Sequence, residues 1–196
     1  MQSVATLLFT LDLFGTGLFA ISGALLAGRK KMDAVGILTV AAVTALGGGT
    51  VRDLLLGNRP VFWVNQSIYL AVAVGGGLVA LGLLRRRFWP GRWLVWLWAE
   101  ALGLAVFNVV GCDKAARKDV SGLVVVLMGM ITAVVGGMIR DLLVGESPLI
   151  LRREVYATAS IAGAMVYVGL AAANVPGGWV RSEERRVGKE CRSRGS

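Results

Sequence analysis

The sequence predicts an all-α polytopic membrane protein built from two inverted three-helix units. Its 196 residues are 56% hydrophobic and include 27 glycines, a composition too apolar for an ordinary soluble domain. The apolar residues form six runs of about 18 residues or more, the length that crosses a bilayer as a helix. The last three runs repeat the pattern of the first three, and an odd number of spans per unit inverts the second unit in the membrane.

The six predicted spans are separated by short connections. All four prolines fall in the connections, where they interrupt no helical hydrogen bond. Trp63 and Trp93 lie near span ends, as expected of side chains that anchor a helix at the membrane interface. The predicted spans are residues 4–26, 34–56, 67–84, 93–111, 121–144 and 155–173.

A shift of 88 positions aligns the two halves of the chain without a gap. It places Asp12 on Glu100 and Pro60 on Pro148, in addition to many apolar positions. A single register over such a length indicates an internal duplication. The predicted units are therefore residues 4–84 and 93–173.

Each half carries a glycine cluster followed by an arginine and an aspartate near the end of its second span. Intramembrane charges are costly, and each glycine weakens a helix by about 1 kcal/mol relative to alanine, so the recurrence indicates a functional feature. We expect a kink or unwound segment that exposes carbonyl groups to a cation, with close helix packing as the alternative. The predicted pore or kink residues are Gly47, Gly48, Gly49, Arg52, Asp53, Gly136, Gly137, Arg140 and Asp141.

The paired charges of each motif are adjacent in sequence. Because neighbouring residues point about 100° apart on a helix, we expect Arg52 and Asp53 to find partners on other helices or in a water-filled vestibule. In that interpretation the carboxylates favour cations and the arginines limit tight binding or gate the pore. The alternative is that Arg52 extends its side chain to the lipid headgroups.

Further polar residues lie inside the predicted spans. Asp12 and Glu100 form a second acidic pair related by the repeat, and they are expected either to line the pathway or to form structural salt bridges. Asn108, Thr44 and Thr132 are expected either to line a pore or to form interhelical hydrogen bonds.

The composition argues against an enzyme and against a bound cofactor. The chain has no histidine and two cysteines, Cys112 and Cys191, which disfavours a metal site, a Cys–His nucleophile and a disulfide framework. The net charge of +9 comes from basic residues between apolar spans, so it indicates membrane orientation and no nucleic-acid partner.

The basic connections predict the orientation. An N-terminus outside the cell places the basic connections at residues 29–31, 85–92 and 152–153 in the cytoplasm, where they contact membrane lipid. The more weakly basic connections at residues 57–66 and 112–120 then face outside. We therefore expect a multi-pass protein of the inner (plasma) membrane whose first span is retained, not a cleaved signal.

The two motifs, together with Leu11–Gly15 and Phe19–Ala24, resemble the prokaryotic trimeric intracellular cation channel family over residues 4–180. That family also carries a glycine-transporter label. The resemblance implies a homotrimer in which each protomer conducts monovalent cations, chiefly potassium, between glycine-kinked second and fifth helices. By motif match these are residues 34–56 and 121–144.

Two other functions remain open at this point. A carrier of a small zwitterion such as glycine is the main alternative, because an inverted repeat also supports alternating access. A membrane scaffold is disfavoured by the repeated intramembrane charges.

Two departures from the family pattern stand out, in addition to the polar tail. Val135 takes the place that Gly47 has in the first motif, which predicts a milder kink. The family's seventh helix is expected to be missing. Residues 181–196 are polar and are expected to be a disordered, non-native tail.

Overall fold

The computed structural model describes residues 2–85, 92–118, 120–152 and 154–174, in which helices are joined by turns and no strand is present. It confirms the all-α polytopic fold. The predicted tail 181–196, the place where a seventh helix was expected to be missing, and Arg153 lie outside the described residues. The helices are α1 (Gln2–Arg29), α2 (Ala34–Leu55), α3 (Phe62–Asn65), α4 (Ile68–Arg85), α5 (Arg92–Ala116), α6 (Gly122–Leu143), α7 (Leu149–Arg152) and α8 (Glu154–Asn174).

Six long helices correspond to the six predicted spans. Within the described residues, α1, α2, α4, α5 and α6 are long and apolar enough to cross a membrane, and α8 contains the apolar stretch Ser160–Gly169. The prediction placed the end of the fourth span too early, because α5 continues to Ala116 and carries Asp113 and Lys114. The short helices α3 and α7 were not predicted.

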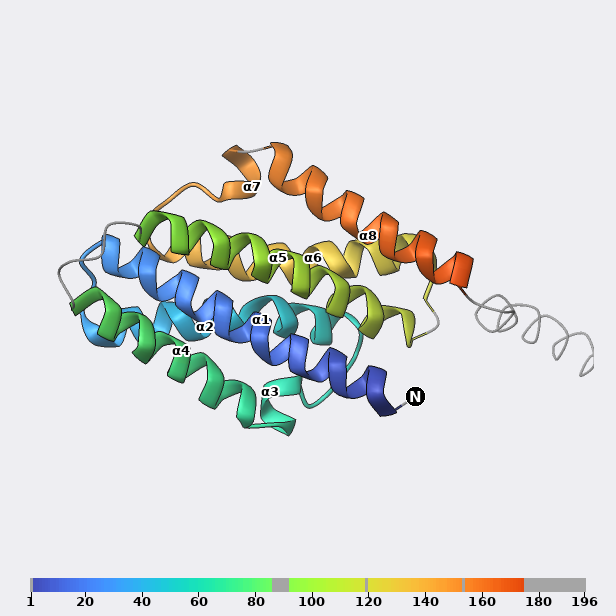
Figure 1. Ribbon diagram of the computed structural model, residues 1–196, viewed down its shortest axis with the longest axis horizontal. Helices are drawn as coiled ribbons and strands as arrows, with labels where there is room; N and C mark the ends of the chain where they lie inside the picture. Colours follow the sequence, from blue (N-terminus) through green and yellow to red (C-terminus); the bar gives the residue numbers. More distant parts are fainter. Residues whose placement is uncertain (1, 86–91, 119, 153, 175–196) are drawn as a thin grey trace, which may run out of the picture.

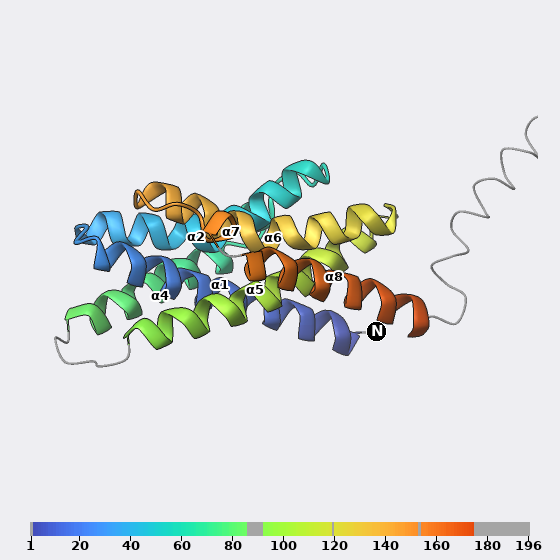
Figure 2. The ribbon, with the colours of Figure 1, turned by 90° about the horizontal axis from the view of Figure 1, so that it is seen from above.

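The two halves run in opposite directions. Figure 1 shows α1, α2 and α4 antiparallel to α5, α6 and α8, respectively, and Figure 2 shows the same arrangement from above. The helices α1, α2, α5 and α6 pack together at the centre. On the outside, α4 packs on α1 and α2, and α8 packs on α5 and α6. The inverted repeat predicted from the sequence is thus the architecture of the chain.

Equivalent residues of the two halves meet in the core. Phe19 and Phe107, which are related by the shift of 88, form an edge-to-face pair with ring centroids 4.9 Å apart. Both rings are buried, and each lies beside a glycine of the other half's first helix, Gly103 and Gly15, respectively. The absence of a side chain at these glycines lets α1 and α5 approach closely.

Both motif helices end in the same way. Gly57 and Gly145 have φ values of 69° and 70°, a left-handed conformation that glycine adopts without strain. The amide of Asn58 donates to the carbonyl of Asp53, and the amide of Glu146 donates to that of Asp141. This glycine cap ends each helix directly after its Arg-Asp pair.

Candidate functional site

Gly47, Gly48 and Gly136 lie where α2 crosses α6, whereas Gly49 faces the ring of Phe62 in α3. A Cβ atom added at Gly48 would sit 2.1 Å from the carbonyl oxygen of Thr132, and one added at Gly136 would sit 2.4 Å from that of Thr44. Both helices are uninterrupted α-helix through their glycines. The prediction of an unwound segment is therefore wrong. Gly48 and Gly136 instead permit close backbone contact between the helices, which was the alternative interpretation.

The threonines at this crossing bond within their own helices. Thr44 Oγ1 donates to the carbonyl of Val40 and Thr132 Oγ1 to that of Met128, each at 2.6 Å. Gly23 and Gly111, which are related by the repeat, pack against these two hydroxyl groups. The donated hydrogen bonds of the threonines are thus intrahelical, which differs from the interhelical bonds that were one of the two expected alternatives; a pore-lining role stays a prediction.

The adjacent arginine and aspartate of the first motif pair with each other. Arg52 donates from Nε and Nη2 to Asp53 Oδ1 at 2.9 and 2.8 Å, and both side chains are buried. The expectation that Arg52 and Asp53 would not pair with each other is wrong, and so is the alternative that Arg52 reaches the headgroups. The arginine side chain is long enough to fold back on its neighbour, and the amide of Phe62 fixes the carboxylate by donating to Asp53 Oδ2 at 2.9 Å.

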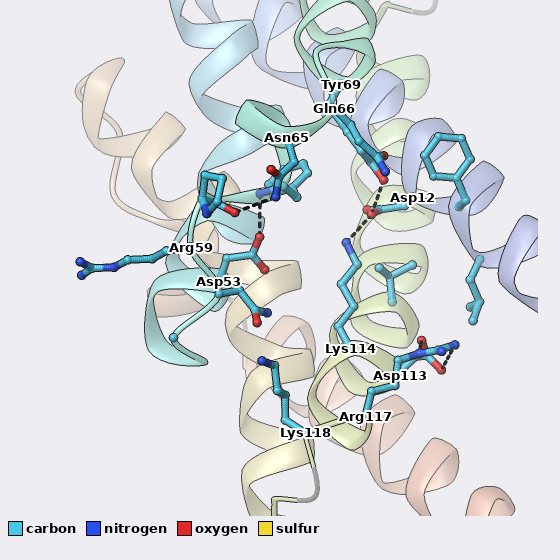
Figure 3. A pocket seen from close by; sticks show the side chains of 17 residues that line it. Asp12, Asp53, Arg59, Asn65, Gln66, Tyr69, Asp113, Lys114, Arg117 and Lys118 are labelled. Carbon is cyan, nitrogen blue, oxygen red and sulfur yellow. Dashed lines mark hydrogen bonds and ion pairs between the residues drawn. The ribbon is translucent and has the colours of Figure 1, made fainter.

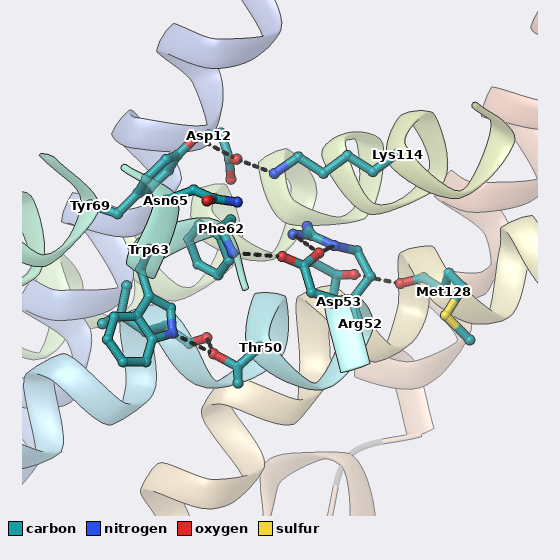
Figure 4. A network of polar contacts seen from close by, with 12 residues as sticks. Asp12, Thr50, Arg52, Asp53, Phe62, Trp63, Asn65, Tyr69, Lys114 and Met128 are labelled. Carbon is teal, nitrogen blue, oxygen red and sulfur yellow. Dashed lines mark hydrogen bonds and ion pairs between the residues drawn. The ribbon is translucent and has the colours of Figure 1, made fainter. Parts of the chain in front are cut away.

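Two further charges complete this group, which we call the first charge cluster. Asp12 accepts a hydrogen bond from the Tyr69 hydroxyl at 2.9 Å and forms an ion pair with Lys114 Nζ at 2.7 Å. Figure 4 shows Lys114 reaching toward Asp12 above the Arg52–Asp53 pair. The cluster comprises Asp12, Arg52, Asp53 and Lys114, and its formal charges balance.

The second charge cluster consists of Glu100, Arg140 and Asp141. Arg140 donates from Nε to Asp141 Oδ1 at 2.9 Å, and its Nη1 donates to Glu100 Oε2 and to Ser22 Oγ. Ser22 in turn donates to Glu100 Oε2 at 2.6 Å. The amide of Leu149 donates to Asp141 Oδ2 at 3.0 Å, so a connection after the helix again fixes the carboxylate. All three charged side chains are buried.

The two clusters carry different residues at positions that are equivalent in the repeat. Lys114 corresponds to Leu26, and Ser22 corresponds to Val110. The sequence did not single out Lys114, Ser22 or Tyr69 as site residues. A usable signal was the position of Lys114 in the last turn of α5, on the apolar helix that also carries Glu100.

A cavity of about 610 Å³ adjoins the first charge cluster. It extends from exposed side chains such as Arg117 to the buried carboxylates of Asp12 and Asp53, as Figure 3 shows. At its rim, hydrogen bonds to Asp113 raise the pKa of the Arg117 guanidinium above its ordinary value. The charged residues that line the cavity are Asp12, Asp53, Arg59, Asp113, Lys114, Arg117 and Lys118.

Asn108 lies apart from both clusters. Its Nδ2 donates to the carbonyl and hydroxyl oxygens of Ser160, each at 2.6 Å, and thereby joins α5 to α8. Buried Cys112 neighbours its side-chain oxygen, with Sγ 3.7 Å away. Within the described residues, no group of three or more His, Cys, Asp or Glu side chains could hold a metal ion.

Comparison with known proteins gives a consistent result. Residues 9–85 and 97–172 match the profile of a family described as "Glycine transporter". A UPF0126 membrane protein from Vibrio cholerae is 47% identical over 164 residues, covering 83% of this chain and 67% of the relative. The UPF0126 inner membrane protein YadS from Escherichia coli K12 is 46% identical over 161 residues, covering 82% of this chain and 77% of the relative.

A solved structure is also similar in sequence and in fold. The TRIC trimeric intracellular cation channel orthologue from Rhodobacter sphaeroides is 42% identical to this chain and superposes with a TM-score of 0.82. The match covers 87% of each chain.

Proposed function

The chain belongs to the prokaryotic TRIC-type channel family, which also carries the glycine-transporter label, and on this basis we propose that it conducts cations across a membrane. Potassium is the proposed main ion. The proposed functional unit is a homotrimer in which each protomer has its own pore, located in the inner membrane with the N-terminus outside. The relatives' names and the grouping of basic connections support this assignment.

The proposed pore runs along the α2–α6 interface, from the cavity at the first charge cluster to the second charge cluster. The observation that carries the proposal is that a cavity leads from the surface to two buried carboxylates, Asp12 and Asp53. Carboxylates at the base of a water-accessible cavity concentrate cations there. The inverted repeat supplies a related set of carboxylates, Glu100 and Asp141, beyond the glycine crossing.

The fixed cations Arg52 and Lys114 also limit how strongly the carboxylates attract a mobile cation. Each carboxylate of the first charge cluster is already paired with Arg52 or Lys114, so it offers a mobile cation moderate attraction. Conduction needs sites that bind an ion weakly enough to release it. The Lys114 ammonium group occupies the place beside Asp12 that a permeating potassium ion would take, so conduction requires this group to move aside.

We infer that the proposed pore is closed in this structure. Gly48 and Gly136 bring the backbones of α2 and α6 into direct contact, with no space for even a methyl group. An ion therefore passes this level when the two helices separate or rotate. The glycines make such a movement feasible, because they have no side chains that would interlock with the other helix.

A carrier of a zwitterion such as glycine is the second candidate. The cavity places ammonium and guanidinium groups close to carboxylates, which suits a ligand that bears both charges. Its closed inner end is also compatible with alternating access. The family's glycine-transporter label favours the same candidate.

Electrical recording separates the two candidates. Purified protein in a planar bilayer with a potassium chloride gradient should give discrete current steps whose reversal potential lies toward that of potassium. Saturable glycine uptake into proteoliposomes, without such steps, would overturn the channel proposal in favour of the carrier.

A further inference from the structure

One ion pair, between Lys30 and Glu146, lies at one end of the molecule and has no counterpart at the equivalent residues of the other end. Lys30 Nζ lies 2.6 Å from Glu146 Oε1, which joins the turn after α1 to the turn after α6. In Figure 1 this is the left end, where α1 and α6 both finish, opposite the N-terminus. The two side chains are 40% and 31% exposed, so the pair is accessible to water.

The backbone connects this pair to the interior. The amide of Glu146 donates to the carbonyl of Asp141 in the second charge cluster. The amide of Lys30 donates to the carbonyl of Leu26, the repeat counterpart of Lys114. The ion pair therefore joins the two turns whose backbone amides bond to Asp141 of the second charge cluster and to Leu26.

The repeat provides an internal comparison. Lys30 corresponds to Lys118, and Glu146 corresponds to Asn58, whose uncharged amide cannot form an ion pair. Lys118 and Asn58 both line the 610 Å³ cavity. At the end that has the ion pair, Leu26 is buried, with 7% of its surface exposed. At the other end, the equivalent residue Lys114 lines the cavity.

We propose that the Lys30–Glu146 pair is a latch that keeps the second end of the pathway closed. When it is released, the turns after α1 and α6 separate, and a second cavity opens with Leu26 at its wall. This proposal rests on the proposed function, because the cavity that the latch covers is part of the proposed α2–α6 pathway. A partly exposed ion pair is weak and is screened by salt, which suits a contact that must open often.

Thiol labelling tests the latch without measuring conduction. In a protein carrying Cys112→Ala and Cys191→Ser, Leu26→Cys is exposed to a charged methanethiosulfonate reagent. Adding Glu146→Gln should raise the labelling rate about two- to fivefold, the change expected on losing a partly exposed ion pair. The charge exchange Lys30→Glu with Glu146→Lys should restore the slow rate. Lys31→Gln, in the same turn and exposed, is the matched control and should leave the rate unchanged.

An equal labelling rate with and without Glu146→Gln would overturn the latch, as would a Lys31→Gln effect of the same size. Both results are independent of whether the protein conducts ions. Faster labelling in a protein that gives no potassium current would contradict the proposed function and support the latch.

Discussion

At the scale of single residues, the two charge clusters have different formal charge. The first balances two carboxylates with Arg52 and Lys114, whereas the second has Glu100 and Asp141 for one arginine. The difference arises at one position of the repeat, where Lys114 corresponds to Leu26. The balance at the first cluster depends on Asp12, because this carboxylate is the ion-pair partner of Lys114.

Asp12→Asn should lower the potassium conductance. The substitution preserves the size of the side chain but leaves the Lys114 ammonium group without its partner at the base of the cavity. One unit charge a few ångströms away contributes about 1–4 kcal/mol in a partly water-filled site, so a fivefold or larger loss is expected in single-channel current. Asp33→Asn is the matched control, because Asp33 is an exposed helix cap at the other end and asparagine caps a helix equally well. A current as large in Asp12→Asn as in Asp33→Asn would contradict this role.

The sequence was sufficient to identify most of the charged residues at the site but not their partners. Asp12, Glu100 and the two Arg-Asp pairs are conspicuous because charge is costly inside an apolar span. Their pairing depends on how a flexible arginine folds back and on how two distant helices are rotated, neither of which a periodic pattern specifies. Lys114 was missed for the same reason, because its partner lies 102 positions away in the chain.

At the scale of helices, the contact between α2 and α6 depends on residues without side chains. Gly48 and Gly136 each face a backbone carbonyl group of the other helix, which cannot move aside as a flexible side chain can. By contrast, Gly75 in α4 and its repeat counterpart Gly163 in α8 have no atom within 4 Å of an added Cβ. The chain therefore offers two matched pairs of helical glycines: Gly48 and Gly136 are tightly packed, whereas Gly75 and Gly163 face open space.

Gly48→Ala and Gly136→Ala should each lower the thermal stability of the protein in detergent. The added methyl group forces the helices apart, and overpacking of this kind typically costs about 1–3 kcal/mol. Gly75→Ala and Gly163→Ala should preserve or raise the melting temperature, because alanine favours a helix by about 0.5–1 kcal/mol over glycine. Equal melting temperatures in the two sets would show that the α2–α6 contact is looser than described.

The helices themselves were largely predictable, since apolar runs of membrane length and the position of proline define them. The end of α5 was not, because Asp113 and Lys114 end the apolar run although the helix continues to Ala116. A tertiary ion pair between Lys114 and Asp12 and a local i,i+4 ion pair between Asp113 and Arg117 stabilise that last turn. The four-residue helices α3 and α7 are too short to give a periodic signal.

At the scale of the whole molecule, an inverted repeat has acquired two unlike ends. The glycine crossing, the Phe19–Phe107 pair and the glycine caps after α2 and α6 obey the repeat. The cavity and the Lys30–Glu146 pair do not, since each belongs to one end. One accessible end and one closed end are compatible with the proposed gated pore, and the α2–α6 contact lies between the two ends.

Cross-linking α2 to α6 tests this central claim most directly. An added Cβ at Gly47 lies 3.2 Å from Ile139 Cδ1, and Ile139→Cys removes that atom, so Gly47→Cys with Ile139→Cys places two thiols across the interface. In a protein lacking Cys112 and Cys191, oxidation should abolish the potassium current, and a reductant should restore it. Each single-cysteine variant should be insensitive to the oxidant. An undiminished potassium current through protein whose cross-link is verified by mass spectrometry would contradict a pore between these helices.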